Sequence, residues 1–188
     1  LPSYNEALNL NILLSKFKRF FKKKNINVLI IIVDDGSTDN SIKIINAFTK
    51  KNNTKNFNIK IIKHKKNLGL GRALKTGFNY CFSKGNDKDV LITMDTDNSH
   101  TISLSYQMAE KIFYKKLDIV IASRYQLQSK IKGLNLSRKI LSFGAAILFK
   151  IIFPIKNIKD YTSGFRAFRL GKIKDAWKLD KKFFSEKG

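Results

Sequence analysis

Two kinds of hydrophobic pattern alternate along the chain. Short runs of β-branched and other aliphatic residues contain no Pro or Gly and predict buried strands. Between these runs, apolar residues recur every three or four positions, which predicts helices with one apolar face. Strands are expected at 28–33, 59–62, 90–94 and 118–122. Helices are expected over 10–21 and 42–48, up to residue 82, over 104–114 and 136–155, and after 169 as far as 182.

The alternation of strand and helix indicates an α/β fold. The run 28–33 is aliphatic at every position, which is typical of a strand covered on both faces in a parallel sheet. Polar motifs follow successive strands, at 34–39, 95–100 and 123–125. Ligands of open α/β sheets bind beyond the carboxyl ends of the strands. The pattern therefore predicts a single domain, over residues 1–188, with a nucleotide-binding architecture.

Asp95 and Asp97 directly follow the strand at 90–94. Residues i and i+2 of an extended chain point to the same side, so the two carboxylates can face one point in space. Two hard oxygen donors at the mouth of a strand suit Mg²⁺ or Mn²⁺, especially when a phosphate completes the coordination shell. Asp, Asn and Ser are also ordinary turn residues, so a polar turn is the alternative interpretation of this stretch alone.

The chain is strongly basic, with 37 Lys and Arg against 14 Asp and Glu and a formal net charge of +23. Such an excess favours anionic partners: nucleic acid, an anionic membrane surface or phosphorylated substrates. The hydrophobic content of 43% is that of a globular protein. The single cysteine, Cys81, excludes an internal disulfide and is expected in the core. His64 lies among lysines and is expected at the surface.

The segment 136–155 is apolar, rich in Phe and Ile, and flanked or interrupted by Arg138, Lys139 and Lys150. It fits either the core or a helix in a membrane interface, where Lys and Arg reach the headgroups. No apolar run reaches the roughly 18 residues of a membrane span. The chain starts at Leu1 without Met and stops at Gly188, so we expect a piece of a longer protein, truncated at both ends.

Seven motifs follow one another along essentially the whole chain. They are Leu-Pro-Ser-Tyr-Asn-Glu (1–6), Val-Asp-Asp-Gly-Ser (33–37), Asn-Leu-Gly-Leu-Gly (67–71), Met-Asp-Thr-Asp-Asn-Ser-His (94–100), Ser-Arg-Tyr (123–125), the helix at Arg138, and Thr-Ser-Gly-Phe-Arg (162–166). In this order they resemble the inverting family-2 glycosyltransferases with a GT-A fold. That fold is Rossmann-like, with three layers and a mostly parallel central sheet. The most similar branch contains the dolichol-phosphate mannosyltransferases and polyprenyl-phosphate sugar transferases.

The resemblance implies transfer of a hexose from a nucleotide-diphosphate sugar, of the GDP-mannose or UDP-glucose type, to a polyprenyl or dolichyl phosphate. The reaction would proceed with inversion and would depend on Mg²⁺ or Mn²⁺. The nucleotide-sugar pocket would contain Pro2, Tyr4, Glu6, Asp34, Asp35, Asp95, Thr96 and Asp97. Asp95 and Asp97 would bind the metal, and Arg124, Arg138 and Ser142 would hold the acceptor phosphate. Asp97 and Arg124 are the expected catalytic residues.

Two arginines near the end of the chain, Arg166 and Arg169, are further candidates for the diphosphate, with surface charge as the alternative for Arg169. Close relatives often carry a metal-contacting Gln where this chain has Ser99. His100 is expected to support the metal motif or the structure rather than to transfer a proton. The family's first strand would precede Leu1, and a further strand with a functional acidic residue would follow Gly188.

A lipid phosphate is already anionic at pH 7, so its transfer requires no strong general base, and no His or carboxylate stands out as one. Such an acceptor would lie in an anionic bilayer surface, so the resemblance and the excess of basic residues together predict peripheral attachment to the cytoplasmic face of a membrane through the segment 136–155. One alternative is a family-2 transferase with a polysaccharide or other hydroxyl acceptor, which would need a base. A second is a basic nucleic-acid-binding module, but the chain contains no recognised nucleic-acid motif.

Overall fold

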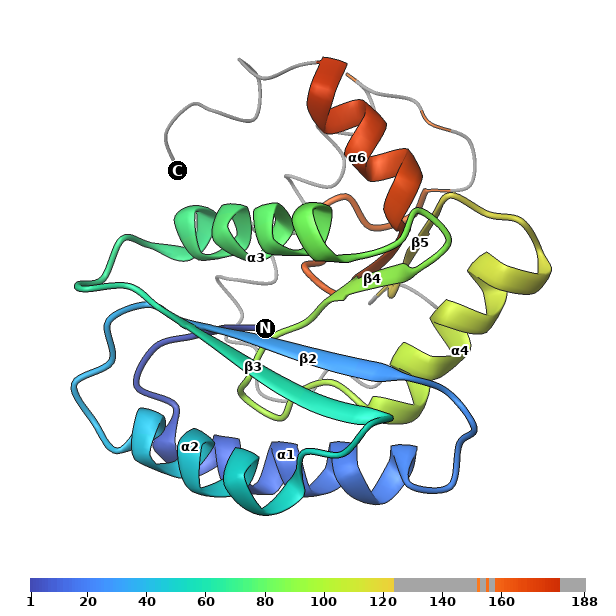
Figure 1. The fold of residues 1–188 in the computed structure, drawn as a ribbon. Helices are drawn as coiled ribbons and strands as arrows, with labels where there is room; N and C mark the ends of the chain where they lie inside the picture. Colours follow the sequence, from blue (N-terminus) through green and yellow to red (C-terminus); the bar gives the residue numbers. More distant parts are fainter. Residues whose placement is uncertain (124–151, 153–154, 156–157, 180–188) are drawn as a thin grey trace.

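The computed structural model describes residues 1–123, 152, 155 and 158–179, and these form two three-stranded sheets with helices around them (Figure 1). The first half contains β1 (Pro2–Ser3), α1 (Ala7–Phe21), β2 (Val28–Asp34), α2 (Ser41–Asn52), β3 (Phe57–Lys63) and α3 (Leu70–Lys84). The second contains β4 (Val90–Thr93), α4 (Ile102–Tyr114), β5 (Ile119–Ile121), β6 (Arg166–Arg169) and α6 (Leu170–Leu179). Every strand and helix expected before residue 123 is present.

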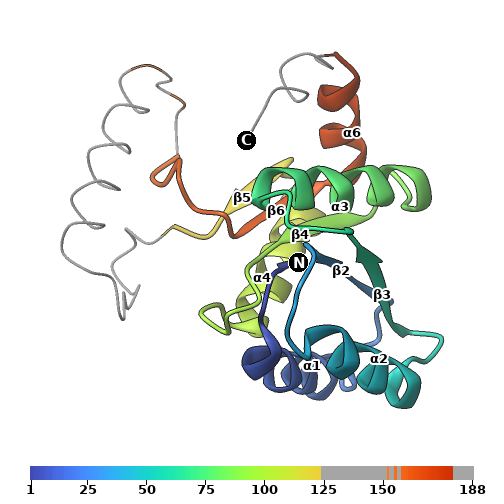
Figure 2. The ribbon, with the colours of Figure 1, turned by 90° about the vertical axis from the view of Figure 1, so that its left-hand side faces the viewer.

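The first sheet is parallel and has the order β1-β2-β3. α1 and α2 cover one of its faces and α3 lies on the other, which produces three layers (Figure 2). In the register of this sheet, Ser3 pairs with Asp34 and Asp34 with Lys63. The carboxyl ends of all three strands therefore meet at one edge, where ligands of such folds bind.

The second sheet has the order β4-β6-β5, and β6 is antiparallel to both of its neighbours. Arg166 pairs with Thr93 and Arg169 with Val90, so the two arginines lie at opposite ends of β4. The hydrophobic pattern does not predict β6, because only two of its four residues are apolar. Its place beside β4 depends on pairing with residues more than seventy positions earlier.

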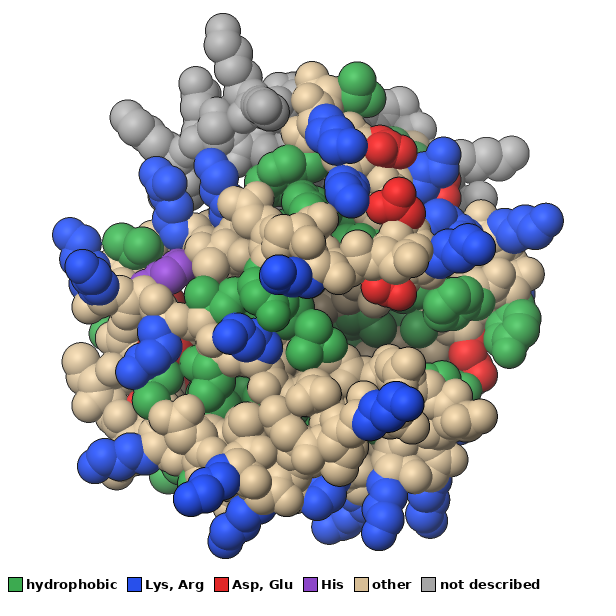
Figure 3. All heavy atoms as spheres, in the orientation of Figure 1, with side chains coloured by type: hydrophobic (Ala, Val, Ile, Leu, Met, Phe, Trp, Pro, Cys, Tyr) green, Lys and Arg blue, Asp and Glu red, His purple; other side chains and the backbone are tan. Residues whose placement is uncertain are grey.

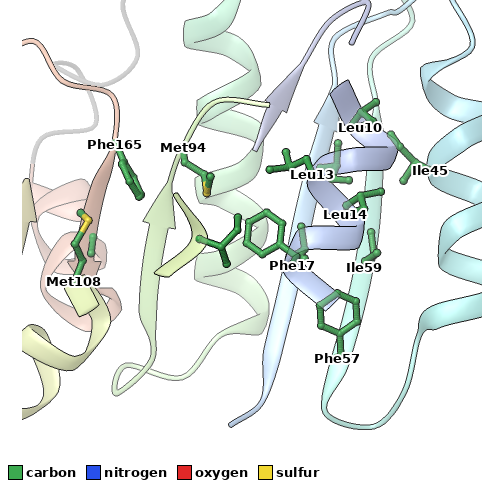
Figure 4. Close-up of a cluster of buried hydrophobic side chains, with 14 of the residues drawn as sticks. Leu10, Leu13, Leu14, Phe17, Ile45, Phe57, Ile59, Met94, Met108 and Phe165 are labelled. Atoms are coloured by element: carbon green, nitrogen blue, oxygen red, sulfur yellow. The ribbon is translucent and has the colours of Figure 1, made fainter. Parts of the chain in front are cut away.

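The main core lies between α1 and the first sheet (Figure 4). Leu10, Leu13 and Leu14 are fully buried and belong to one cluster with Ile30 and Ile32 of β2. Three leucines at positions i, i+3 and i+4 form the apolar stripe that the sequence predicts. Burial of each such side chain contributes about 1.5–3 kcal/mol to the stability of the fold.

The expectation that both faces of the run 28–33 are covered is correct only in part. Ile32 and Val33 are buried, but Leu29 is 50% exposed. α3 approaches the carboxyl end of β2, where a Cβ on Gly77 would lie 3.5 Å from Val33. Towards the other end of β2, Leu29 borders an apolar cavity of about 1020 Å³ that extends to β4. α3 therefore covers the carboxyl end of β2 more closely than its amino end.

A second, smaller core joins α3 and α6 to the second sheet. Its buried members are Leu91, Phe168 and Leu170. Trp177 of α6 stacks on Phe78 of α3 with ring centroids 5.8 Å apart. Cys81 packs against this cluster, as expected of a core residue, and burial raises the pKa of its thiol to about 11.

Candidate functional site

A pocket of about 370 Å³ lies at the edge where the strands of the first sheet end. Its lining comes from β1, from the segments that follow β1, β2, β3 and β4, and from the start of α3. The lining residues are Pro2, Ser3, Tyr4, Glu6, Asp35, Asn67, Gly69, Leu70, Ala73, Asp95, Thr96 and Asp97. Seven of the eight residues expected in the nucleotide-sugar pocket are therefore neighbours in space, although up to 95 positions separate them in the sequence.

Asp34 is the expected pocket residue that the structure does not place in the lining. Its side chain is buried beneath the turn that follows β2, with 1% of the residue exposed. Oδ2 accepts a hydrogen bond of 3.2 Å from the amide of Ser37. Oδ1 has no hydrogen-bond partner among the described residues. In this arrangement Asp34 supports the turn from behind, while Asp35 borders the pocket.

Asp35 is held by three donors from a different part of the chain. The amide of Leu68 donates to Oδ1 at 3.0 Å and the amide of Gly69 to Oδ2 at 2.8 Å. Nδ1 of His64 lies 2.6 Å from Oδ1. Burial alone would raise the pKa of the Asp35 carboxyl, but these hydrogen bonds outweigh burial and hold it below its ordinary value of 3.8.

The expectation that His64 lies at the surface is wrong. Only 10% of its side chain is exposed, and Nε2 lies 2.9 Å from the hydroxyl of Thr76 in α3. The lysines around His64 indicate a surface position for it. However, β3 ends at Lys63, and the side chain of His64 then turns inward towards Asp35. The same reasoning that selects Asp95, a polar residue directly after a buried strand, would have selected His64.

The opening motif and the turn after β2 hold each other in place. The side-chain oxygen of Asn5 accepts a hydrogen bond of 2.8 Å from the amide of Thr38. In return, Asp39 accepts one of 3.0 Å from the amide of Ala7, and the Ser41 hydroxyl accepts one of 3.0 Å from the amide of Glu6. Asn5 has φ of 54°, a left-handed conformation that Asn tolerates better than most residues. These bonds fix the amino-terminal wall of the pocket.

The segment Asp95-Thr96-Asp97 brings two carboxylates to the pocket and turns the residue between them inward. Asp95 and Asp97 are exposed in the lining, whereas Thr96 is 3% exposed. The amide of Ser99 donates a hydrogen bond of 2.9 Å to Asp97. Nε2 of His100 lies 3.3 Å from Asp95, and this hydrogen bond is the main reason why the pKa of Asp95 is lowered, against the opposing effect of burial.

The turn before β6 is organised by a buried carboxylate, that of Asp160, and by the partly buried guanidinium of Arg166. Asp160 is fully buried and accepts hydrogen bonds of 3.1 Å from the amides of Thr162 and Ser163. The Arg166 guanidinium donates to the carbonyl oxygens of Ser163 at 2.7 Å and Tyr161 at 2.6 Å. Burial lowers the pKa of Arg166, and the nearby Asp160 opposes this. These bonds give Arg166 a structural role in the turn, at the same end of β4 as Asp95.

Arg169 lies at the other end of β6 and away from the pocket. It bonds Asp118 at 3.1 Å and the carbonyl oxygen of Ile112 at 2.9 Å. Phe165, in the motif that precedes β6, is 2% exposed and lies against His100 with ring centroids 4.5 Å apart. Packing is the role that the structure supports for Phe165.

Arg124, Arg138 and Ser142 lie outside the described residues, as does nearly all of the segment 136–155. Ile152 and Ile155 of that segment are described and are more than half exposed. In the part of the chain that the structure describes, no helix has the length and apolar character needed to cross a membrane. Within the same part, no three His, Cys, Asp or Glu side chains gather closely enough to form a complete metal site.

Comparison with known proteins identifies the class. The family model of glycosyl transferase family 2 matches residues 1–177. A dolichol-phosphate mannosyltransferase from Pyrococcus furiosus is 33% identical over 170 residues, which cover 90% of this chain and 45% of that protein. A dolichyl-phosphate beta-glucosyltransferase from Dictyostelium discoideum is 31% identical over 183 residues, covering 89% of this chain and 52% of that protein.

The fold agrees with this result. A solved mannosyltransferase from Pyrobaculum calidifontis, in complex with GDP-Man and Mn²⁺, is similar with a TM-score of 0.57 at 14% identity, over 97% of this chain and 44% of that one. The architecture is therefore the GT-A fold, as expected from the motifs. The chain belongs to glycosyl transferase family 2. It spans about half the length of the mannosyltransferase from Pyrococcus furiosus and of the glucosyltransferase from Dictyostelium discoideum.

Proposed function

We propose that residues 1–188 form a GT-A catalytic domain that transfers a hexose from a nucleotide-diphosphate sugar to a polyprenyl or dolichyl phosphate, with inversion. The observation that carries this proposal is the convergence of Pro2, Tyr4, Glu6, Asp35 and the segment 95–97 on one pocket. Membership of the family and the names of the two relatives support the same reaction and acceptor. GDP-mannose and UDP-glucose are the donor types to test.

The donor set in the pocket fits a divalent cation that a diphosphate helps to hold. Asp95 and Asp97 present hard carboxylate oxygens, and Mg²⁺ or Mn²⁺ bound through one or two carboxylates commonly takes substrate phosphates as its other ligands. The similar Pyrobaculum structure contains both GDP-Man and Mn²⁺. We assign Asp95 and Asp97 as the metal ligands and Asp97 as catalytic. When bound, the cation would neutralise charge that develops on the departing diphosphate.

The chemical step is a direct displacement. An anionic oxygen of the acceptor phosphate forms a bond to the anomeric carbon, while the bond from that carbon to the donor diphosphate breaks and its electron pair leaves with the nucleotide diphosphate. Attack from the face opposite the leaving group inverts the anomeric centre. The attacking oxygen carries no proton at pH 7, so none of the described residues has to act as a base. Arg124, with Arg138 and Ser142, would hold the acceptor phosphate through charge-assisted hydrogen bonds.

The basic surface suits an acceptor that lies in an anionic bilayer. Lys and Arg side chains are spread over the face of the molecule in Figure 3, and the net charge is +23. Each basic residue near an anionic membrane surface adds roughly 1 kcal/mol of attraction. We therefore propose peripheral attachment on the cytoplasmic face through the apolar segment 136–155. Flotation with anionic liposomes should be lost when Ile147 and Phe149 are both changed to Ser, and unchanged flotation would rule this attachment out.

The donor site is tested by calorimetric titration with GDP and with UDP, each with and without Mn²⁺. The expected result is metal-dependent binding of one nucleotide, weakened at least about tenfold in Asp97→Asn. Asp87→Asn is the matched control, because Asp87 is a 70% exposed carboxylate that pairs with Lys174 in α6. Binding that is equally strong in both variants, or absent from the folded wild type, would refute the proposed donor site.

A further inference from the structure

One buried polar cluster near the pocket is not used by the mechanism above. His64 leaves the end of β3 and places its ring between Asp35 and Thr76, with both ring nitrogens in hydrogen-bond range. The ring is not part of the pocket lining, whereas Asp35 is. Of the two hydrogen-bond partners of His64, Asp35 is the one that borders the pocket.

The position of one proton on His64 follows from its partner. An ionised carboxylate only accepts hydrogen bonds, so the 2.6 Å contact requires a proton on Nδ1. The Thr76 hydroxyl, 2.9 Å from Nε2, can donate or accept and so can pair with the second ring nitrogen. Thr76 belongs to α3, so the imidazole connects three elements: the turn after β2, the end of β3, and the helix.

Asp35 passes this constraint on to the loop that borders the pocket. Its carboxylate accepts hydrogen bonds from the backbone amides of Leu68 and Gly69. Gly69 immediately precedes α3 and has φ of 88°. The terminal torsion of an Asp side chain is broad, so a carboxylate with fewer donors would rotate more freely. The bond from His64 fixes the plane of the carboxylate and, with it, the two amides.

We propose that His64 is a positioning residue of the donor pocket, which acts through Asp35 to hold the loop 67–69 in the shape that binds the nucleotide. This inference rests on the proposed function, because the ligand of the pocket is taken to be a nucleotide diphosphate. Neither the motifs nor the hydrophobic pattern assigns a role to His64. Its partner Thr76 lies on α3 and is likewise outside every motif.

Two conservative variants separate positioning from simple packing. In Asn the amide nitrogen is bonded to Cγ, as Nδ1 is in His, so His64→Asn can still donate to Asp35. In Gln the amide nitrogen lies one atom further out, where it corresponds to Nε2 and faces Thr76. We expect His64→Gln to weaken binding of the preferred nucleotide with Mn²⁺ about tenfold, as expected for loss of one hydrogen bond to a charged group. His64→Asn should stay within about threefold of the wild type.

Thr76→Val and Thr49→Val form a matched pair of controls. Both remove a helix hydroxyl, but that of Thr49 bonds the carbonyl oxygen of Ile45 within α2, away from the pocket. We expect weaker nucleotide binding in Thr76→Val only. Equal affinities of His64→Asn and His64→Gln, or an equal loss in Thr49→Val, would overturn the positioning role and leave the donor site standing.

A second measurement works without nucleotide. Hydrogen exchange of the Leu68 and Gly69 amides should be faster in His64→Gln than in His64→Asn. If the folded wild type binds neither GDP nor UDP, the proposed function fails and the nucleotide part of this inference fails with it. Exchange rates that are the same in the two variants would show instead that His64 does not hold the loop.

Discussion

The hydroxyl of Thr96 donates a hydrogen bond of 3.1 Å to the carbonyl oxygen of Pro2, across 94 positions of sequence. This bond ties the middle of the Asp-Thr-Asp segment to the opening motif. A second link lies beside it, where the side-chain Nδ2 of Asn98 donates to the backbone carbonyl oxygen of Asn9 at 3.0 Å. The exposed carboxylates of Asp95 and Asp97 therefore belong to a segment that these two hydrogen bonds fix to the amino-terminal wall of the pocket.

Thr96→Val should remove the first of these links while keeping the shape of the side chain. Thr96 is 3% exposed, so the Pro2 carbonyl loses a partner that water cannot easily replace. We expect a loss of about 1–2 kcal/mol in the free energy of unfolding, measured by chemical denaturation, and weaker nucleotide binding. Thr101→Val is the control, since Thr101 is exposed and makes no capping hydrogen bond to α4. Equal stability losses in both variants would contradict this account.

Gly36→Ala should be among the most damaging single substitutions near the pocket. Gly36 has φ of 75°, and a Cβ there would lie 2.7 Å from the amide nitrogen of Asn67. Strain and collision together are expected to cost about 2–4 kcal/mol in unfolding free energy. The added methyl group also pushes the loop 67–69 away from Asp35, so nucleotide affinity should fall as well.

Gly164→Ala is the matched control for Gly36→Ala. Gly164 has no positive φ, and a Cβ there would meet nothing within 4 Å. Its unfolding free energy should change by less than about 0.5 kcal/mol. Thermal or chemical unfolding of the two variants side by side measures this difference, and similar values for both would refute the role assigned to Gly36.

The sequence predicts the strands and helices up to residue 123 other than β1, because each of these carries a local signal, whereas Pro2 and Ser3 carry none. Leu10, Leu13 and Leu14 mark one face of α1, and the uninterrupted run of β2 marks a parallel strand. The same holds for the pocket. Asp35 directly follows β2, whose carboxyl end meets those of β1 and β3 at one edge. Asp95 lies just beyond β4 of the second sheet, and the hydrogen bond from Thr96 to Pro2 holds its segment beside that edge.

The features that the sequence does not reveal depend on pairing between distant segments. β6 has no local signal, and its position follows from its register with β4. The inward turn of His64 follows from the buried carboxylate of Asp35, which a run of neighbouring lysines obscures. The residues alone make Arg166 and Arg169 look equally suited to a diphosphate. The antiparallel pairing of β6 with β4 places Arg166, and not Arg169, at the end of β4 that leads to Asp95.

Arg169→Ala should lower stability without changing nucleotide binding. Its guanidinium bonds Asp118 and two backbone carbonyl oxygens at the end of β6 that is remote from the pocket. We expect a loss of about 1–3 kcal/mol in unfolding free energy and a nucleotide affinity within about twofold of wild type. Lys172→Ala removes the same charge from an exposed position of α6 and should change neither quantity. A specific loss of nucleotide affinity in Arg169→Ala would place this arginine at the diphosphate after all.

The low pKa of Asp35 predicts how stability depends on pH. The folded state holds this carboxyl below its ordinary value of 3.8, so ionised Asp35 stabilises the fold above that pH. The contribution is lost as the pH falls through the folded-state pKa, because below that pH the carboxyl is protonated in both the folded and the unfolded chain. Asp35→Asn should therefore be less stable than wild type at pH 7, and the difference should shrink as the pH falls below about 4. Urea denaturation between pH 7 and pH 3 measures this difference.

Asp87→Asn is the control, because Asp87 is the more exposed partner of an ion pair with Lys174. Its free energy of unfolding should differ from that of the wild type by less than about 1 kcal/mol over the whole pH range. A difference for Asp35→Asn that stays constant over this range would mean that the folded state does not depend on the ionised carboxylate.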